Sequence, residues 1–328
     1  MKLHSLAISG LVTMNLHALN NEGSEGNTMM TRMVEIVGED GNLYTVNAVS
    51  GDMFKHIQAE HLFREAISAS LPLCGGCRRF DANRIACDHE LAAEVEKSEE
   101  YQKAKSEGKI DSYNLRRVIQ ACTLDDCEGI LLTGWAGSKS LARKSCIEFS
   151  WVVGRPETTR TEAYMHAKFV PEGRGAGSGS EQNLGQNIFH RPASSGQYAV
   201  VLNIDLYRIG RNDITLDYEL DDEMRRKRIQ AMLKSVLYTF VKPTGAHRNT
   251  QHPHILDFSG VVTASSSSLP APTLSPLNKN YLNEIEAVAQ NLNKVSGSDD
   301  VKTWQFSGVG NFSEVMGTII NTVQPWSE

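Results

Sequence analysis

Cysteine and histidine side chains lie close enough in this 328-residue sequence to suggest a metal site. Five of the six cysteines fall between residues 74 and 127, and the first two form a Cys-x-x-Cys pair. Thiolates and imidazoles at such spacings are typical ligands of structural zinc, although clustered thiols can also be reduced residues of a loop or core. The predicted zinc ligands are Cys74, Cys77, Cys87 and His89, with Cys122 and Cys127 competing for the second pair.

A polar, glycine-containing segment follows the first long apolar stretch of the chain. Asn20, Asn21 and Asn27 can donate hydrogen bonds to phosphate or sugar oxygens, and Gly23 and Gly26 allow a ligand to approach the backbone. No Gly-Lys-Ser/Thr follows, which excludes the phosphate loop of nucleotide hydrolases. The segment is therefore either a nucleic-acid contact or a solvated loop.

Two further segments offer hydrogen-bond donors with little negative charge. Lys55 and His56 lie in the first turns of a predicted helix, where free N–H groups and the helix dipole favour an anion. Gly245, Ala246, His247 and Arg248 follow a second predicted helix and suit contact with a sugar-phosphate chain. We expect these two segments and the asparagine-rich one to converge on one side of the sheet.

Other basic residues are secondary candidates for RNA contact. The tetrad Arg225–Arg228 is the densest cluster, and its helical position favours a solvated face over a binding site. The remaining candidates are Lys139, Arg143, Arg160, His166 and Lys168.

Motifs for catalysis are missing from the sequence. It contains no Gly-x-Ser-x-Gly elbow, no His-Glu-x-x-His and no Ser-His-Asp order. Gly173–Gly177 imitates part of a dinucleotide fingerprint but does not lie between a strand and a helix. We therefore predict no catalytic residues and no required cofactor.

The periodicity of apolar residues indicates which elements position these side chains. Alternation predicts strands, and apolar stripes at helical spacing predict helices that begin near Ser50, Asp221 and Tyr281. Without insertions the order is strand, helix, strand, strand, helix, strand, which is the α+β ferredoxin-like arrangement. The main strands expected are Leu6–Leu16, Thr31–Val37, Leu43–Val49, Gly129–Thr133, Cys146–Val153, Tyr198–Leu206 and Phe258–Thr263.

Composition limits the classes of function. A net charge of −6 disfavours a generally basic nucleic-acid binder and leaves room for a local basic groove. No apolar run approaches the roughly 18 residues of a membrane span, and the first residues do not resemble a signal peptide. We therefore expect a cytoplasmic protein without membrane partners.

Several of these segments resemble the CRISPR-associated autoregulator (DevR) family, whose members form the repeated backbone of Cascade-type complexes. The resemblance covers most of residues 3–265 and is most specific in the first 65. The blocks that carry it, in chain order, are Leu6–Leu16 with Asn20–Asn27, Val49–His56, Asp125–Leu131, Tyr198–Gly210 and Gly245–Arg248.

The resemblance implies an RRM-like (RNA-recognition-like) palm with an inserted finger subdomain and a thumb hairpin. Copies of such a subunit assemble along one guide RNA (crRNA), contact other Cascade subunits, and leave the bases free to pair with target DNA. The expected parts are the palm at 1–70, 128–154 and 198–265, the finger at 71–127, the thumb hairpin with its flexible loop at 155–197, and a C-terminal helical extension at 266–328.

Two other functions stay open at this stage. Related type III backbone subunits cut RNA with an Asp in the first glycine loop; this loop has Glu22 and Glu25 but no Asp, so we predict no nuclease activity. The enzyme alternative is a metal-dependent RNA endonuclease that uses Glu22, Glu25 and His56. The third alternative is a free-standing autoregulator that binds its own transcript.

Overall fold

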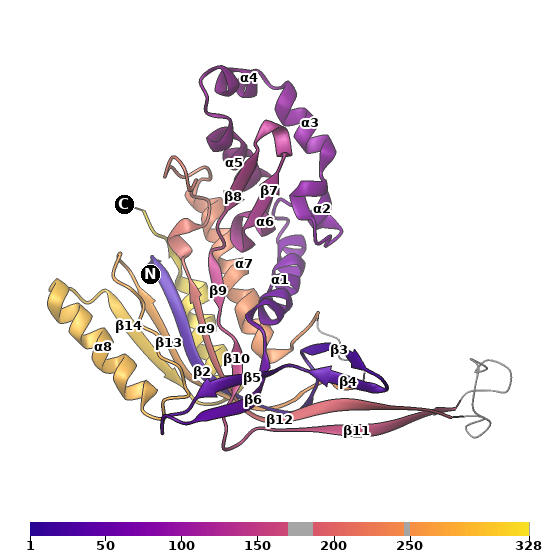
Figure 1. Ribbon diagram of the computed structural model, residues 1–328. Helices are drawn as coiled ribbons and strands as arrows, with labels where there is room; N and C mark the ends of the chain where they lie inside the picture. Colours follow the sequence, from indigo (N-terminus) through magenta and orange to yellow (C-terminus); the bar gives the residue numbers. More distant parts are fainter. Residues whose placement is uncertain (170–185, 246–249, 328) are drawn as a thin grey trace.

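The computed structural model describes residues 1–169, 186–245 and 250–327, which form a mixed helix and strand protein (Figure 1). Its strands are β1 (Lys2–Leu3), β2 (Ser5–His17), β3 (Asn21–Glu25), β4 (Thr28–Thr31), β5 (Met33–Val37), β6 (Leu43–Val49), β7 (Ile130–Thr133), β8 (Ser140–Arg143), β9 (Ile147–Phe149), β10 (Val152–Gly154), β11 (Arg160–Phe169), β12 (Gln186–Ile204), β13 (His254–Ser265), β14 (Val301–Phe306) and β15 (Gln324–Pro325). Its α-helices are α1 (Gly51–Ser68), α2 (Gly75–Arg78), α3 (His89–Lys97), α4 (Glu99–Ser106), α5 (Ile110–Ala121), α6 (Thr123–Glu128), α7 (Asp222–Val241), α8 (Tyr281–Ser296) and α9 (Gly308–Thr322). Short 3-10 helices are η1 (Arg84–Cys87), η2 (Trp135–Gly137) and η3 (Leu206–Arg208).

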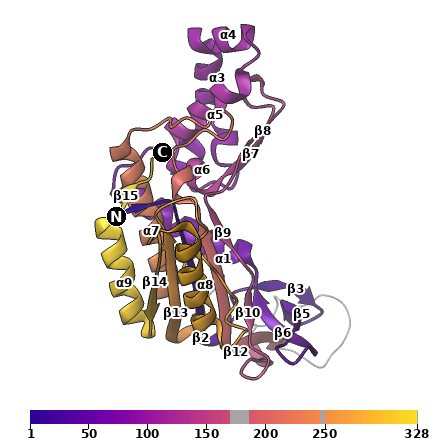
Figure 2. The same cartoon turned by 90° about the vertical axis from the view of Figure 1, so that its left-hand side faces the viewer.

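One large sheet organises the fold, with its main strands in the order β14-β13-β2-β12-β10-β6-β5 (Figures 1 and 2). Neighbours along this order are antiparallel. The apolar alternation of β2 buries Leu6, Ile8, Val12 and Met14 in one core. The predicted order of elements is confirmed as β2, α1, β9 with β10, β12, α7 and β13.

Helices α1, α7 and α9 contribute to the same core. Ser50 caps α1 by accepting from the Met53 N–H, and Asp221 caps α7 by accepting from the Met224 N–H. Phe240 of α7 stacks on the β13 ring of Phe258, with ring centroids 4.3 Å apart. The two caps fix the starts of α1 and α7, and the Phe240–Phe258 contact anchors the C-terminal part of α7 to β13.

The C-terminal segment differs from the purely helical extension that we expected at 266–328. Helix α8 packs through Tyr281 and Ile285 on Val261 in a small separate core. The chain then returns as β14, which pairs antiparallel with β13 and extends the sheet. Helix α9 follows and packs beside α7 and β13. The prediction missed β14 and α9.

Helices α2 to α6 form an inserted unit that projects from the sheet (Figure 1). The partly helical insertion predicted at 71–127 contains α2 to α5 and nearly all of α6. The strands β7 and β8 that follow form a separate two-stranded sheet among the described residues, and β8 packs on α5. Placing 128–143 in the main sheet was therefore wrong, because the ladder hydrogen bonds of β7 go to β8 and not to a strand of that sheet.

The predicted strand at 146–153 is two strands, with a break at Ser150 and Trp151. β9 pairs Phe149 with Leu202, and β10 pairs Val153 with Ala199, so the register against β12 shifts by one residue between them. Such an extra residue reverses which side chains face the core. Trp151, which the alternation within 146–153 predicts to lie on the apolar face of the strand, is consequently 43% exposed.

Strands β11 and β12 form a long antiparallel hairpin that extends beyond the sheet (Figure 1). This agrees with a hairpin predicted inside 155–197. β12 continues from the hairpin into the centre of the sheet, where it pairs with β2. The flexible loop predicted within 155–197 falls partly on residues 170–185, which lie outside the described residues. Within those residues, no helix has both the length and the apolar character needed to cross a membrane.

Candidate nucleic-acid interface

The asparagine-rich segment is a β-hairpin instead of the loop that we expected. β3 and β4 pair across Gly26, whose φ of +57° suits a tight turn. Gly23 has a φ of +108° and lies where the pairing of the two strands is irregular. A Cβ at either glycine would meet no atom within 4 Å, so both positions are open to a ligand.

The three asparagines of this hairpin have different roles. Asn20 is buried, and its side-chain oxygen accepts a 2.8 Å hydrogen bond from the Ser50 N–H. Asn20 therefore fixes the start of α1 and is not available for RNA, which corrects its prediction as a contact. Asn27 is exposed, and its backbone carbonyl accepts a 2.8 Å hydrogen bond from the His190 N–H of β12. Asn21 is half-buried in β3.

The segment after α7 approaches α1 at one end and β12 at the other. Gly245 has a φ of +74°, and a Cβ there would lie 2.9 Å from His56 Nε2. Gln251 donates to the Pro192 carbonyl at 2.7 Å, and Arg191 donates to Thr250 at 3.4 Å. The predicted contacts Ala246, His247 and Arg248 lie outside the described residues.

The β11–β12 hairpin is contacted by the β3–β4 hairpin and by residues that follow α7. The β3–β4 hairpin touches β12 at His190, and Thr250 and Gln251 touch it at Arg191 and Pro192. These β12 residues pair with Ala163–Met165 of β11, part-way along the hairpin. Gly245, at the other described end of the segment after α7, lies beside His56 of α1.

A cleft of about 470 Å³ lies between α1 and the inserted unit. Lys55 lines it, but its ammonium is held by the Glu128 carbonyl at 3.1 Å and Ser145 Oγ at 2.7 Å. His56 lies on the exposed side of α1 at the same cleft. Asp52, Asp81 and Glu128 also line the cleft, so it is mixed in charge.

Burial raises the pKa of the Glu128 carboxyl, and the nearby cations Lys55 and Arg84 oppose that shift. Burial therefore disfavours the charged form of this carboxyl group at the cleft.

Comparisons with known proteins identify the family. The family model described as "CRISPR-associated negative auto-regulator DevR/Csa2" matches residues 8–286. The chain belongs to this family. A relative, the "CRISPR-associated protein Cas7/Cst2/DevR" of Methanocaldococcus jannaschii, is 23% identical over 304 residues, which cover 88% of this chain and 90% of that protein.

Solved structures also match this family member over most of its length. One chain of a "CRISPR RNA-guided surveillance complex, pre-nicking" is 12% identical, with 90% of both chains covered and a TM-score of 0.45. A chain of another "CRISPR RNA-guided surveillance complex" is 14% identical, with 96% of this chain and 99% of that chain covered and a TM-score of 0.44.

Arg143 does not belong to the interface of this DevR/Csa2 family member. Its side chain is fully buried and donates to Asp126 Oδ1 at 2.7 Å and to the carbonyls of Arg208 and Arg211. Arg143 is thus a structural residue, which corrects its prediction as an RNA contact. Lys139 is exposed at the turn between β7 and β8, within the inserted unit and away from the β11–β12 hairpin (Figure 1).

The Arg225–Arg228 tetrad was predicted to form a solvated face of its helix, but two of its arginines are buried. Arg228 is fully buried and donates to Asp126 Oδ2 at 2.8 Å. Arg225 is 1% exposed, stacks on Tyr218 with its guanidinium 3.5 Å from the ring centroid, and donates to the Trp326 carbonyl. A helix with this many charged residues hides two of them because carbonyls and carboxylates accept from most of their donors.

The hairpin holds the remaining predicted contacts, all in β11. Arg160 is exposed near the base, and His166 stacks on Phe189 with ring centroids 5.5 Å apart. Lys168 pairs with Asn187 in the backbone register. The sequence reasoning missed Arg191, whose guanidinium lies 5.0 Å from the Phe189 ring. The available signal was an Arg two residues after an aromatic residue in a strand, because side chains two residues apart lie on the same face of a strand.

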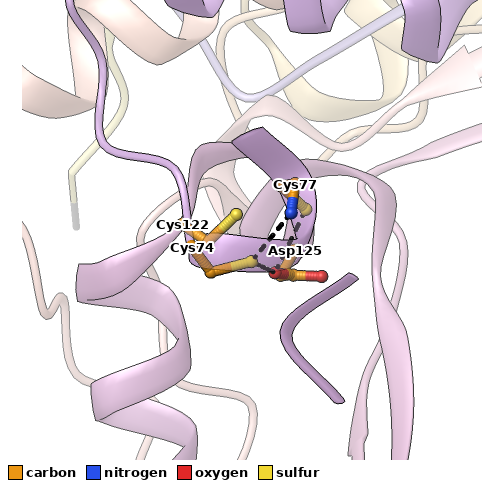
Figure 3. Close-up of side chains that lie close together, drawn as sticks. All are labelled: Cys74, Cys77, Cys122 and Asp125. Atoms are coloured by element: carbon orange, nitrogen blue, oxygen red, sulfur yellow. Dashed lines mark hydrogen bonds between the residues drawn. The ribbon is translucent and has the colours of Figure 1, made fainter. Parts of the chain in front are cut away.

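The predicted metal ligands are divided by the structure (Figure 3). Cys74 and Cys77 lie together with Cys122 and Asp125, and one ligand atom of each lies within 4.8 Å of the others. Cys87 is not in this group, and its thiol donates to the Arg84 carbonyl at 3.1 Å. The prediction of His89 and Cys87 as ligands is wrong for this cluster: His89 is exposed on α3, and Cys127 is buried elsewhere in the core.

Proposed function

We propose that this protein is a non-catalytic, crRNA-binding backbone subunit of a type I CRISPR complex that targets DNA. Copies of the chain would lie along one guide RNA together with other Cascade subunits, and the guide would pair with target DNA. The observation that carries the proposal is that the β3–β4 hairpin and the residues after α7 both contact the β11–β12 hairpin, with Gly245 beside His56 of α1, in a member of the DevR/Csa2 family.

The strand order supports an RRM-like palm. The four strands β13-β2-β12-β10 lie side by side, and α1 and α7 form the two helical connections. This corresponds to a ferredoxin-like core. The inserted unit from α2 to β8, residues 71–143, would then be the finger, and the β11–β12 hairpin the thumb.

The interface is suited to the backbone of RNA more than to its bases. Exposed backbone at Gly23 and Gly26, the His56 imidazole and the Arg191 guanidinium offer donors to phosphate and ribose. Base pairing would carry the sequence information, so the protein needs no pattern of base-specific side chains. A net charge of −6 is compatible with a few phosphate contacts per copy.

The hairpin carries side chains suited to a contact beyond its own chain. Tyr164 and Met165 are 44% and 68% exposed along β11. An aromatic and a flexible thioether on an extended hairpin can pack against an unstacked base or a neighbouring subunit. We propose that this hairpin reaches the RNA held by the next copy.

An endonuclease would need Glu22, Glu25 and His56 to gather around a metal. Within 1–169, 186–245 and 250–327, the grouped side chains that could hold an ion are those of the Cys74 cluster, and these three residues are not among them. Glu22 instead forms an ion pair with Arg32. These contacts support a binding role over a cleaving one.

Incubation with a mature guide RNA and Mg²⁺ or Mn²⁺ tests the proposal. We expect the labelled RNA to stay intact and to elute with the protein in gel filtration. Metal-dependent fragments that disappear in Glu22→Ala or Glu25→Ala would favour the endonuclease. Binding confined to the protein's own transcript, as a discrete monomer–RNA complex, would favour the autoregulator.

A further inference from the structure

We propose that Cys74, Cys77, Cys122 and Asp125 form a structural zinc site at the base of the inserted unit (Figure 3). All four side chains are buried, with none more than 4% exposed. This site is separate from the RNA interface, and the inference does not depend on RNA binding.

The geometry suits tetrahedral coordination. The four ligand atoms lie within 4.8 Å of one another. Tetrahedral zinc with Zn–S bonds of about 2.3 Å separates its ligands by about 3.8 Å, so small side-chain movements would close the site. Three thiolates and one carboxylate form a closed, four-ligand set that leaves no position for a substrate.

The environment of the Asp125 carboxyl group is a second, independent reason to propose a bound metal ion. Its carboxyl group is fully buried, yet Oδ2 receives only long S–H contacts from Cys74 at 3.4 Å and Cys77 at 3.6 Å. Oδ1 has no hydrogen-bond partner. A buried carboxylate left in this condition is costly, and a bound cation would satisfy it.

The local backbone is already arranged as in a Cys-x-x-Cys metal knuckle. The Cys77 N–H donates to Cys74 Sγ at 3.3 Å, which supports a negative charge on that sulfur. A Cβ at Gly76 would lie 1.9 Å from the Arg84 carbonyl oxygen, so the tight packing of α2 on η1 requires glycine there.

The site joins the start of the insertion to α6. Cys74 and Cys77 follow α1 where the chain enters the inserted unit, and Cys122 and Asp125 lie at the start of α6, after α3 to α5 and before β7. A 2.8 Å backbone hydrogen bond from the Thr123 N–H to the Pro72 carbonyl already connects these two segments. Zinc would therefore close a long loop, and its binding would release the thiol protons and stabilise the folded insertion.

Zinc rather than calcium or magnesium follows from the ligand type. Soft thiolates select zinc over hard cations, which prefer sets of oxygen ligands. A disulfide between two of the thiols is the competing chemical state of the cluster.

Metal analysis of the full-length chain tests this proposal. We expect protein expressed in zinc-supplemented medium and gel-filtered without chelator to retain one zinc per chain. Cys122→Ser should lose the ion, whereas the matched Cys87→Ser should keep it. Cys146→Ser, a buried cysteine outside the cluster, reports any loss that comes from core disruption alone.

Cobalt substitution of the wild-type chain gives a readout that needs no variant. Tetrahedral thiolate ligation should produce intense sulfur-to-cobalt charge-transfer bands, which zinc would then displace. The proposal is overturned if the wild type carries no more zinc than the Cys74→Ser/Cys77→Ser double variant and shows no such bands. Zinc retained in Cys122→Ser, zinc lost in Cys87→Ser, or a native disulfide within the cluster would overturn it equally.

Discussion

Asp126→Ala is expected to lower the free energy of unfolding by about 3–5 kcal/mol, the range for breaking a buried ion pair. The Asp126 carboxylate binds Arg143 at 2.7 Å and Arg228 at 2.8 Å, and all three side chains are 0% exposed. It also accepts from the Gly210 N–H at 3.2 and 3.1 Å. One carboxylate therefore joins α6, β8, α7 and the segment after β12.

The large effect comes from the charges that the substitution leaves behind. Without Asp126, the Arg228 guanidinium keeps its 2.7 Å bond to the Ile119 carbonyl but loses its carboxylate. Arg143 keeps Asp213 at 2.9 Å. Arg228 would then be a buried cation without its carboxylate partner, and Arg143 would depend on Asp213, which also pairs with Arg208. Leaving a buried charge uncompensated costs far more than the lost hydrogen bonds alone.

Urea unfolding followed by tryptophan fluorescence measures this prediction. Glu223→Ala is the matched control, because it removes the partner of Lys227 in an exposed pair on α7. Such a surface pair contributes at most about 1 kcal/mol. Equal stability of the two variants would contradict the structural role given to Asp126.

His56→Ala combined with Arg248→Ala is expected to weaken guide-RNA binding by about tenfold or more per residue. A charge-assisted hydrogen bond to phosphate contributes about 1.5–3 kcal/mol, and about 1.4 kcal/mol corresponds to a factor of ten. Gly245 packs against His56, so the segment that carries Arg248 begins beside the imidazole. Filter binding at several salt concentrations should also show a smaller salt dependence for the double variant.

Two features sharpen this experiment. Lys55→Ala is left out because its ammonium braces the Glu128 carbonyl and Ser145, and its loss would disturb the cleft itself. Lys227→Ala is the control, since it removes an exposed cation near the opposite end of α7 from Gly245. Unchanged affinity of the double variant, or an equal loss in the control, would refute the assigned contacts.

Much of the fold could be predicted because its signals are local. Alternation in β2 and β12 and the apolar stripe of α7 each reflect burial on one face, which a sequence records directly. β9 and β10 could not be separated, because the one-residue shift near Trp151 depends on pairing with β12. β7 and β8 were assigned to the wrong sheet because periodicity does not record which strand pairs with which.

The site was predicted less completely because residue type does not reveal burial. Asn20, Arg143 and Arg228 have the chemistry of RNA contacts, yet tertiary partners use all three inside the protein. Spacing found Cys74 and Cys77 but not the fourth ligand, since Asp125 approaches them only through the return of the chain after α5. Contacts between distant segments decide such roles.

The mass of the protein–RNA assembly as a function of RNA length tests the central claim most directly. Light scattering coupled to gel filtration, with guide RNAs of increasing length and unrelated sequence, should show the number of bound copies rising in even steps with length. A single copy bound at every length, or no binding at low salt, would contradict a backbone subunit that lines the guide RNA.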